Sequence, residues 1–179
     1  DPAGINKDKL KYVMQLKNEQ RGRISEYEKK YPKAKFFAKD KPWKVACDIA
    51  IPCATENELS QSDAKTLIKN GVIAVAEGAN MPCTPEAIKA FQNSKVLYAP
   101  GKASNAGGVA VSGLEMAQNS LKNTWSRKIV DGKLQEIMTD IHSSCLEYGK
   151  EKNHIDYLKG ANIAGFVKVA DAMLAQGVV

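Results

Sequence analysis

Apolar runs and amphipathic segments alternate along residues 45–100. Three apolar runs have the length of a buried strand, and they occupy 45–51, 72–78 and 95–100. Between them lie two segments whose apolar residues recur at helical spacing, with connections of only a few residues. This order predicts an α/β fold with a partial parallel sheet that is flanked by helices.

Capping residues indicate where the two intervening helices begin and end. The first can begin at Ser60 or Ser62, either of which can cap it, and it stops at the Asn-Gly pair that ends at Gly71. The second begins at Thr84, which is followed by a proline typical of a first helical turn, and it ends near Asn93.

Helical spacing also dominates both flanks of this central region. At the amino end the pattern predicts helix through 7–32, and 34–37 is a candidate short strand. At the carboxyl end it predicts long helices over 109–123, 130–149 and 163–175. We interpret the regular apolar residues of these helices as core packing.

The loops after the three predicted strands are polar, small or glycine-rich. They are PCATENEL at 52–59, GANMPCTP at 78–85 and PGKASNAGG at 100–108. In open parallel sheets, including Rossmann-like dinucleotide-binding folds, ligands bind beyond the carboxyl ends of the strands. We therefore expect a ligand at these three loops.

The composition is that of an ordinary soluble globular domain. The chain has 179 residues, of which 44% are hydrophobic and 26% are charged. Its apolar runs fall short of the roughly 20 residues that span a membrane, and its amino end is rich in charge. We expect a cytoplasmic protein with no membrane partner.

A net charge of +6 raises the question of nucleic acid. The basic residues are spread over 7–44 and mixed with glutamates, whereas nucleic-acid sites concentrate basic charge. We expect no nucleic-acid partner; a basic DNA binder stays an alternative, which a salt-sensitive complex would support. The four cysteines form no CxxC pair and have no histidine at ligand spacing, so we expect no metal site and no disulfide framework.

Acidic and histidine residues give no sign of an acid–base pair. Glu77, Glu115 and Asp48 fall on different predicted elements, and no histidine accompanies them. His142 lies within a predicted helix and His154 in a polar loop. We assign a catalytic role to none of these residues.

Four segments resemble glutamate dehydrogenases of the small-subunit hexameric, NADP-type family. They are 52–59, 77–82, 99–119 and 160–179, and they occur in the family's order. The resemblance implies an oxidoreductase that converts L-glutamate reversibly to 2-oxoglutarate and ammonia. It also implies NADP as the cofactor, favoured over NAD, and a homohexamer.

Motifs that this family carries elsewhere are missing. No G-x-G-x-x-G turn follows a strand, and neither the glycine-rich loop with the catalytic lysine nor the relay aspartate occurs. The chain also begins at Asp1 without a methionine. We therefore expect a C-terminal fragment, inactive alone, with these catalytic residues upstream. Residues 1–155 would belong to the dinucleotide-binding domain, and 156–179 would form a helix that returns to a substrate domain and here exposes its apolar face.

The resemblance assigns two substrate contacts to one helical turn. Ser112 matches the family serine whose hydroxyl helps to hold the substrate γ-carboxylate, and Val109 would line the same pocket. The alternative for Ser112 is a helical serine that bonds back to its own backbone.

Four further residues are candidate cofactor contacts, three of them from the resemblance and Asn105 from its position. Asn80 resembles the asparagine near the nicotinamide and ribose, and Ala54 and Thr55 resemble the small residues over which that ring lies. Asn105 precedes a glycine-rich helix start, where the backbone can approach a ligand closely. Turn and cap chemistry is the alternative for these side chains, and a stand-alone nucleotide- or partner-binding module is the alternative for the whole chain.

Overall fold

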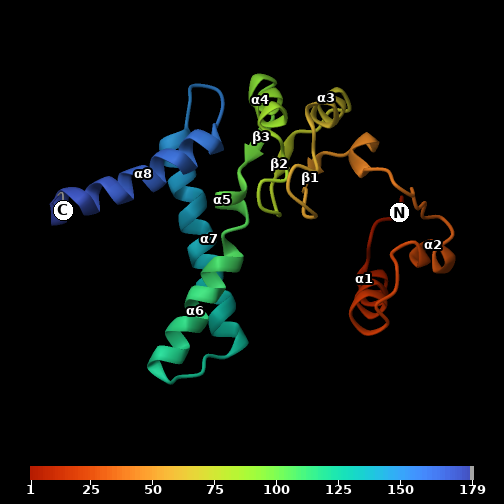
Figure 1. The fold of residues 1–179 in the computed structure, drawn as a ribbon, viewed down its shortest axis with the longest axis horizontal. Coiled ribbons are helices and arrows are strands. Elements are labelled where there is room, and N and C mark those ends of the chain that lie inside the picture. Colours follow the sequence, from red (N-terminus) through yellow and green to blue (C-terminus); the bar gives the residue numbers. More distant parts are fainter. Residues whose placement is uncertain (178–179) are drawn as a thin grey trace. The chain divides into compact units, whose positions relative to one another are not determined.

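A computed structural model of the chain describes residues 1–177. The backbone divides into two compact units, a smaller one over 1–42 and a larger one that begins at Trp43. The larger unit contains the sheet and the long helices (Figure 1).

A three-stranded parallel sheet lies in the larger unit, in the order β1-β2-β3. Ala50 pairs with Val75 and Val75 pairs with Tyr98, so these residues form one row across the sheet. Helices follow β1 and β2, which confirms the α/β order that the hydrophobic pattern predicts. The bounds are β1 Ile49–Ala50, α3 Gln61–Lys69, β2 Ala74–Ala76, α4 Pro85–Asn93 and β3 Leu97–Ala99.

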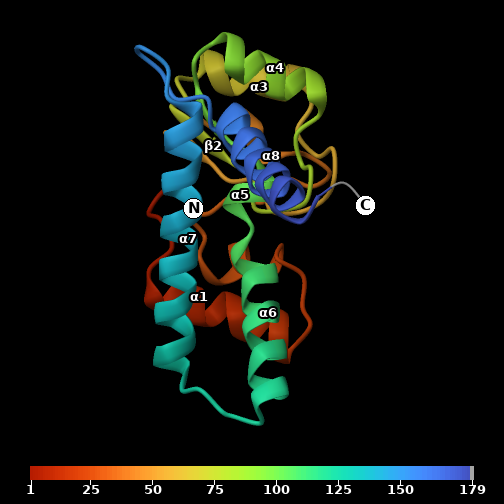
Figure 2. The ribbon, with the colours of Figure 1, turned by 90° about the vertical axis from the view of Figure 1, so that its left-hand side faces the viewer.

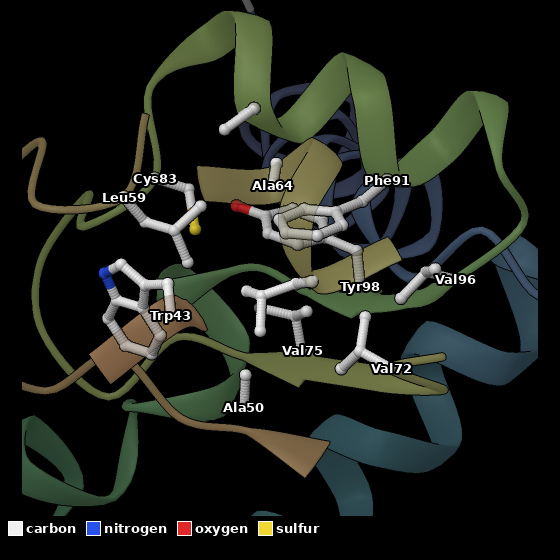
Figure 3. Packing of buried hydrophobic residues seen from close by; sticks show 12 residues of the cluster. Trp43, Ala50, Leu59, Ala64, Val72, Val75, Cys83, Phe91, Val96 and Tyr98 are labelled. Carbon is white, nitrogen blue, oxygen red and sulfur yellow. The ribbon is translucent and has the colours of Figure 1, made fainter. Parts of the chain in front are cut away.

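One face of the sheet packs against α3 and α4 and forms the hydrophobic core (Figure 3). The row of Ala50, Val75 and Tyr98 is buried there, and the ring of Phe91 from α4 stacks on Tyr98 with centroids 6.2 Å apart. Trp43 belongs to the same cluster. Full burial of a side chain such as Phe91 stabilises the fold by about 1.5–3 kcal/mol.

The opposite face of the sheet is exposed. Ile49 and Leu97 belong to the neighbouring row across the sheet, and they keep 56% and 39% of their surface. In the described residues, the predicted strands are therefore buried on one face only. The physical reason is that α3 and α4 contribute to a core on one face only, and alternate residues of a strand point to opposite faces.

The strands are also shorter than the apolar runs that predict them. β1 has two residues of the predicted 45–51. Its ladder with β2 begins where Ile49 pairs with Ala74, and the Asp48 carbonyl accepts from the amides of Ile73 and Ala74 at 2.9 and 3.2 Å. Apolar composition indicates burial, whereas pairing with a neighbour decides the length of a strand.

Local capping confirms the predicted helix ends in the sheet region. Ser60 and Asp63 form a capping box, in which each side chain accepts from the backbone amide of the other. Gly71 follows the end of α3 with φ +86°, a conformation that favours glycine. Thr84 caps α4 and accepts from the Ala87 amide at 3.3 Å.

Four helices follow the sheet in the described residues. α6 and α7 run side by side as a hairpin (Figure 2). α8 crosses α7 where Gly160 meets Cys145, and a Cβ on Gly160 would overlap the Cys145 carbonyl, so the two backbones touch. The bounds are α5 Gly101–Ser104, α6 Gly107–Leu121, α7 Arg127–Gly149 and α8 Tyr157–Gln176.

The smaller unit is helical but interrupted. The predicted continuous helix through 7–32 is wrong, because the chain turns at Gly22, whose amide donates to the Leu16 carbonyl at 2.8 Å. The buried Leu16 side chain packs directly on Gly22. The candidate strand at 34–37 is also wrong, since it joins no ladder in the described residues. The bounds are α1 Lys7–Met14, η1 Gln15–Glu19, α2 Glu26–Lys30 and, leading into the larger unit, η2 Pro42–Lys44.

Within residues 1–177, no helix combines the length and apolarity that crossing a bilayer requires. No group of three or more His, Cys, Asp or Glu side chains in that range is arranged to hold a metal ion.

Candidate functional site

The loops that leave β1 and β2 are joined by backbone hydrogen bonds. The amides of Gly78 and Ala79 donate to the Pro52 carbonyl at 2.9 and 3.0 Å. Further along, Asn57 donates to the Met81 carbonyl at 2.9 Å. The two loops therefore form one continuous surface at the carboxyl edge of the sheet.

The loop after β3 is joined to this surface through side-chain amides. Asn105, at the end of α5, donates from Nδ2 to the Ala79 carbonyl at 3.1 Å and to Asn80 Oδ1 at 3.0 Å. Asn80 is exposed and Asn105 is partly buried. The fold thus brings together two of the predicted cofactor residues, although 25 positions separate them in the sequence.

A buried carboxylate lies beneath this pair. Glu77 follows β2 and keeps only 4% of its surface. Its Oε2 accepts from the Gly101 amide at 2.7 Å, and its Oε1 accepts from the Cys83 amide at 3.2 Å. Its backbone carbonyl accepts from Ser104 Oγ at 2.6 Å. One bond comes from the loop after β2 and two come from the short helix α5, at the carboxyl edge of the sheet.

Sequence reasoning missed the role of Glu77 because it looked only for an acid–base pair. The available signal was an acidic residue at the end of an apolar strand run, directly before the GAN segment at 78–80. A charged side chain at such a place is rarely buried unless other groups satisfy it.

Two ionisable neighbours of Glu77 keep their protons. Burial raises the pKa of Tyr98 well above its ordinary value, and a hydrogen bond to the Glu77 carboxylate and its charge raise it further. Burial likewise raises the pKa of the Cys83 thiol, with added contributions from Glu77. Both groups therefore stay neutral and able to donate to the Glu77 carboxylate.

A cavity of about 630 Å³ opens beside this network. Its lining includes Glu77, Asn80 and Asn105 together with Tyr98 and Lys102. The walls combine apolar surface with a few polar groups that converge, as in sites for small organic ligands.

The structure does not bring the other two predicted cofactor residues into this cavity lining. Ala54 and Thr55 are exposed on the loop that follows β1. The Ala54 amide donates to Glu58 Oε1 at 2.8 Å, which fixes the turn locally. A ligand that reached both places would have to extend along the carboxyl edge of the sheet.

The predicted substrate residues lie on α6, outside the lining of this cavity. Val109 keeps 73% of its surface, and Ser112 is also exposed. Ser112 Oγ donates to the Gly108 carbonyl at 3.4 Å, which is the helical back-bond described as its alternative. The two side chains are three positions apart on one helix face and open to solvent.

The sequence of residues 1–177 matches the family model of the Glutamate/Leucine/Phenylalanine/Valine dehydrogenases. The chain belongs to this dehydrogenase family. The resemblance stated from the four segments is therefore confirmed.

Curated members of this dehydrogenase family match over the whole chain. A glutamate dehydrogenase of Bacteroides thetaiotaomicron is 59% identical over 100% of this chain. An NAD-specific glutamate dehydrogenase of Porphyromonas gingivalis is 54% identical over 99% of this chain. An NADP-specific one of Salmonella typhimurium is 53% identical over 100% of this chain. In each case the chain spans 40% of the relative's length.

A solved dehydrogenase has the same fold. The crystal structure of Plasmodium falciparum glutamate dehydrogenase superposes with a TM-score of 0.92 at 48% identity. The match covers 100% of this chain and 39% of that one. The predicted α/β fold class is confirmed by this agreement.

Proposed function

We propose that this chain supplies the dinucleotide-binding side of a glutamate dehydrogenase. The proposed reaction is the reversible NAD(P)-dependent oxidative deamination of L-glutamate to 2-oxoglutarate and ammonia. Family membership and the relatives' names support the reaction. The observation that carries the assignment is the Asn80–Asn105 pair, because it presents amide donors and acceptors at the edge where parallel sheets bind nucleotides.

The nicotinamide cofactor fits the groups at this edge. Asn80 has amide groups that can both donate and accept, which suits a carboxamide and a ribose. Ala54 and Thr55 offer a surface of small side chains, on which a flat ring can lie. The bound nicotinamide supplies the hydride chemistry, and the protein groups orient it. Asn105 would hold Asn80 in place through the 3.0 Å bond.

The glutamate side chain is proposed to contact α6. Ser112 would donate to the γ-carboxylate, and Val109 would line the same pocket. Both side chains are exposed, so their surfaces are open to a ligand. A hydroxyl at this place favours glutamate over an apolar amino acid, because a buried polar group without a partner costs about 1–3 kcal/mol.

The cofactor preference and the assembly are parts of the same proposal. The names of the relatives include both NAD-specific and NADP-specific enzymes, and we favour NADP. We further propose a cytoplasmic homohexamer, with the catalytic lysine and aspartate outside these 179 residues. Residues 1–155 would belong to the dinucleotide-binding domain.

The test is an assay of a full-length protein that contains these 179 residues. Reduced cofactor oxidation is followed with 2-oxoglutarate and ammonia, using NADPH and NADH in parallel. We expect turnover with a higher kcat/KM for NADPH, and no turnover by the 179-residue chain alone. A full-length protein that binds either nucleotide without turnover would support a stand-alone nucleotide-binding module instead.

The helix α8 extends this proposal to domain organisation. Phe166 and Leu174 keep 71% and 84% of their surface, so the helix presents apolar groups to solvent. We propose that residues 156–179 pack on the substrate domain in the full-length protein. A hydrophobic dye should then bind the 179-residue chain more strongly than the full-length protein. Equal dye binding by the two would contradict this packing.

A further inference from the structure

The Glu77 carboxylate is the feature that the proposed function leaves unexplained. In the described part of the chain its carboxylate accepts from two backbone amides, and the buried Tyr98 and Cys83 line the same cavity. Placing a carboxylate in the interior without a cation is costly in free energy, and an apolar residue of similar volume avoids that cost. Stability alone is therefore a poor explanation for this side chain.

The two carboxylate oxygens of Glu77 bond to different loops. Oε1 accepts from the Cys83 amide, which ends the loop that carries Asn80. Oε2 accepts from the Gly101 amide, which begins the turn that carries Asn105. These are charge-assisted hydrogen bonds, the stronger kind in proteins. One side chain thus fixes the separation of the loops on which the asparagine pair depends.

Close packing around Gly101 makes this arrangement sensitive to small displacements. A Cβ at Gly101 would lie 3.1 Å from the Ala79 carbonyl oxygen and 3.2 Å from both Glu77 Oε2 and Asn105 Nδ2. These three atoms are part of the network that ends at Asn80. A shift of the carboxylate by a few tenths of an ångström would therefore be passed to the asparagine pair.

We propose that Glu77 is a positioning residue for the nicotinamide nucleotide. Its carboxylate holds the loop of Asn80 and the turn of Asn105 at the separation at which the two amides bond and face the ligand. This inference rests on the proposed function, and it adds a residue whose effect on the nucleotide is indirect.

The first test uses Glu77→Gln and Glu77→Asp in a full-length dehydrogenase that contains these residues. The glutamine keeps the shape but presents a donor to one of the two amides, and the aspartate keeps the charge but is too short to reach both. We expect the KM for the reduced cofactor to rise about tenfold in Glu77→Gln, and the KM for 2-oxoglutarate to change less than about twofold. Glu77→Asp keeps one of the two bonds and should show an intermediate rise.

The matched control is Asp131→Asn, which also replaces a carboxylate by its amide. Asp131 is exposed on α7, where its Oδ2 accepts from Gln135 Nε2 of the same helix at 2.8 Å. It should leave both KM values unchanged. Hydrogen exchange adds a readout that needs no turnover: Glu77→Gln should speed exchange at the amides of Cys83 and Gly101, and Asp131→Asn should not.

A double mutant decides whether Glu77 acts through the asparagine pair. Asn105→Ala combined with Glu77→Gln should raise the cofactor KM no more than the larger single change, because both remove the same positioning. Fully additive effects, or an unchanged cofactor KM in folded Glu77→Gln and Glu77→Asp, would overturn the positioning role alone. A wild-type protein without turnover would overturn the proposed function and, with it, this inference.

Discussion

The strand-end loops and the helix α6 both carry predicted site residues, but the fold treats them differently. At the strand ends, Asn105 bonds to Asn80 and to the Ala79 carbonyl, over the buried carboxylate of Glu77. On α6, Ser112 bonds only back to its own helix in the described contacts, and Val109 is open to solvent. The strand-end loops are organised by contacts within this chain. The pocket at α6 would be completed by a surface from outside these residues.

This difference indicates how ligand binding would differ in free energy between the strand-end loops and α6. A side chain that is already fixed loses little conformational entropy when a ligand arrives. Asn80 and Asn105 are in that position, whereas Ser112 first has to exchange its weak 3.4 Å back-bond for a ligand. Substitutions in the loops should therefore change both stability and binding, and substitutions on α6 should change binding alone.

Ser112→Leu in the full-length protein should have the largest effect of these variants, and the effect should be on activity. We expect kcat/KM for glutamate to fall about 100-fold, because the γ-carboxylate would lose a hydrogen-bond donor and meet an apolar group. The free energy of unfolding should change by less than about 0.5 kcal/mol, since Ser112 is exposed. Ser120→Leu, at another exposed serine of α6, is the control and should keep full activity. Equal losses in both variants would remove Ser112 from the substrate site.

Asn105→Ala should show the next largest effect, on stability as well as binding. It removes two hydrogen bonds from a partly buried side chain and should cost about 1–2 kcal/mol in urea unfolding. The affinity for the reduced cofactor should fall in parallel. Asn119→Ala on exposed α6 is the matched control, with no loss in either measurement. If Asn105→Ala unfolds like the wild type, the loops are not organised by this pair.

Alkaline pH should weaken the larger unit, because Cys83 and Tyr98 have raised pKa values in the folded state. Unfolding restores ordinary values near 9.0 and 10.0, so above pH 9 the unfolded state loses protons that the folded state keeps. The two groups therefore leave the free energy of unfolding unchanged below pH 9. As the pH rises further, they lower it by at most about 1.4 kcal/mol per pH unit for each group. Urea unfolding between pH 8 and about 10.5 measures this slope. Cys83→Ala should reduce the slope of the unfolding free energy against pH. Cys53→Ala, which removes an exposed loop thiol, should leave the slope unchanged.

The smallest effect is a change in thiol labelling without any change in stability. Cys53 is exposed beside Ala54, and Cys83 and Cys145 are buried. Iodoacetamide should therefore label Cys53 first in the native protein. Bound cofactor should slow that reaction and leave the partly buried Cys47 unaffected. Labelling of Cys53 at the same rate with saturating cofactor would show that the ligand does not extend over the first loop.

Local chemistry explains which parts of the fold could be predicted from the sequence. The starts of α3 and α4 depend on Ser60 and Thr84, whose partners lie three residues away, and both predictions are confirmed. Strand length and the break at Gly22 depend on pairing and packing that hydrophobic spacing does not encode. Both were predicted wrongly for that reason.

The same reasoning applies to the candidate site. The two amides that bond to Glu77 are 6 and 24 positions away in the sequence, and only the fold brings them to the carboxylate. Asn80 was identified from the family resemblance and Asn105 from its place before a glycine-rich helix start, without any indication that they bond to each other. The proposed roles of Ala54, Thr55, Val109 and Ser112 stay predictions.

The contact between Gly160 and the Cys145 carbonyl has a consequence for how this protein could be altered. Because backbone atoms meet at this crossing of α7 and α8, any side chain at position 160 would force the two helices apart. Phe166 and Leu174 lie beyond the crossing and are exposed, so exchanging them would not disturb it. If α8 packs on a substrate domain as proposed, a designer who exchanged these two residues would change the surface that α8 recognises, whereas the glycine has to stay.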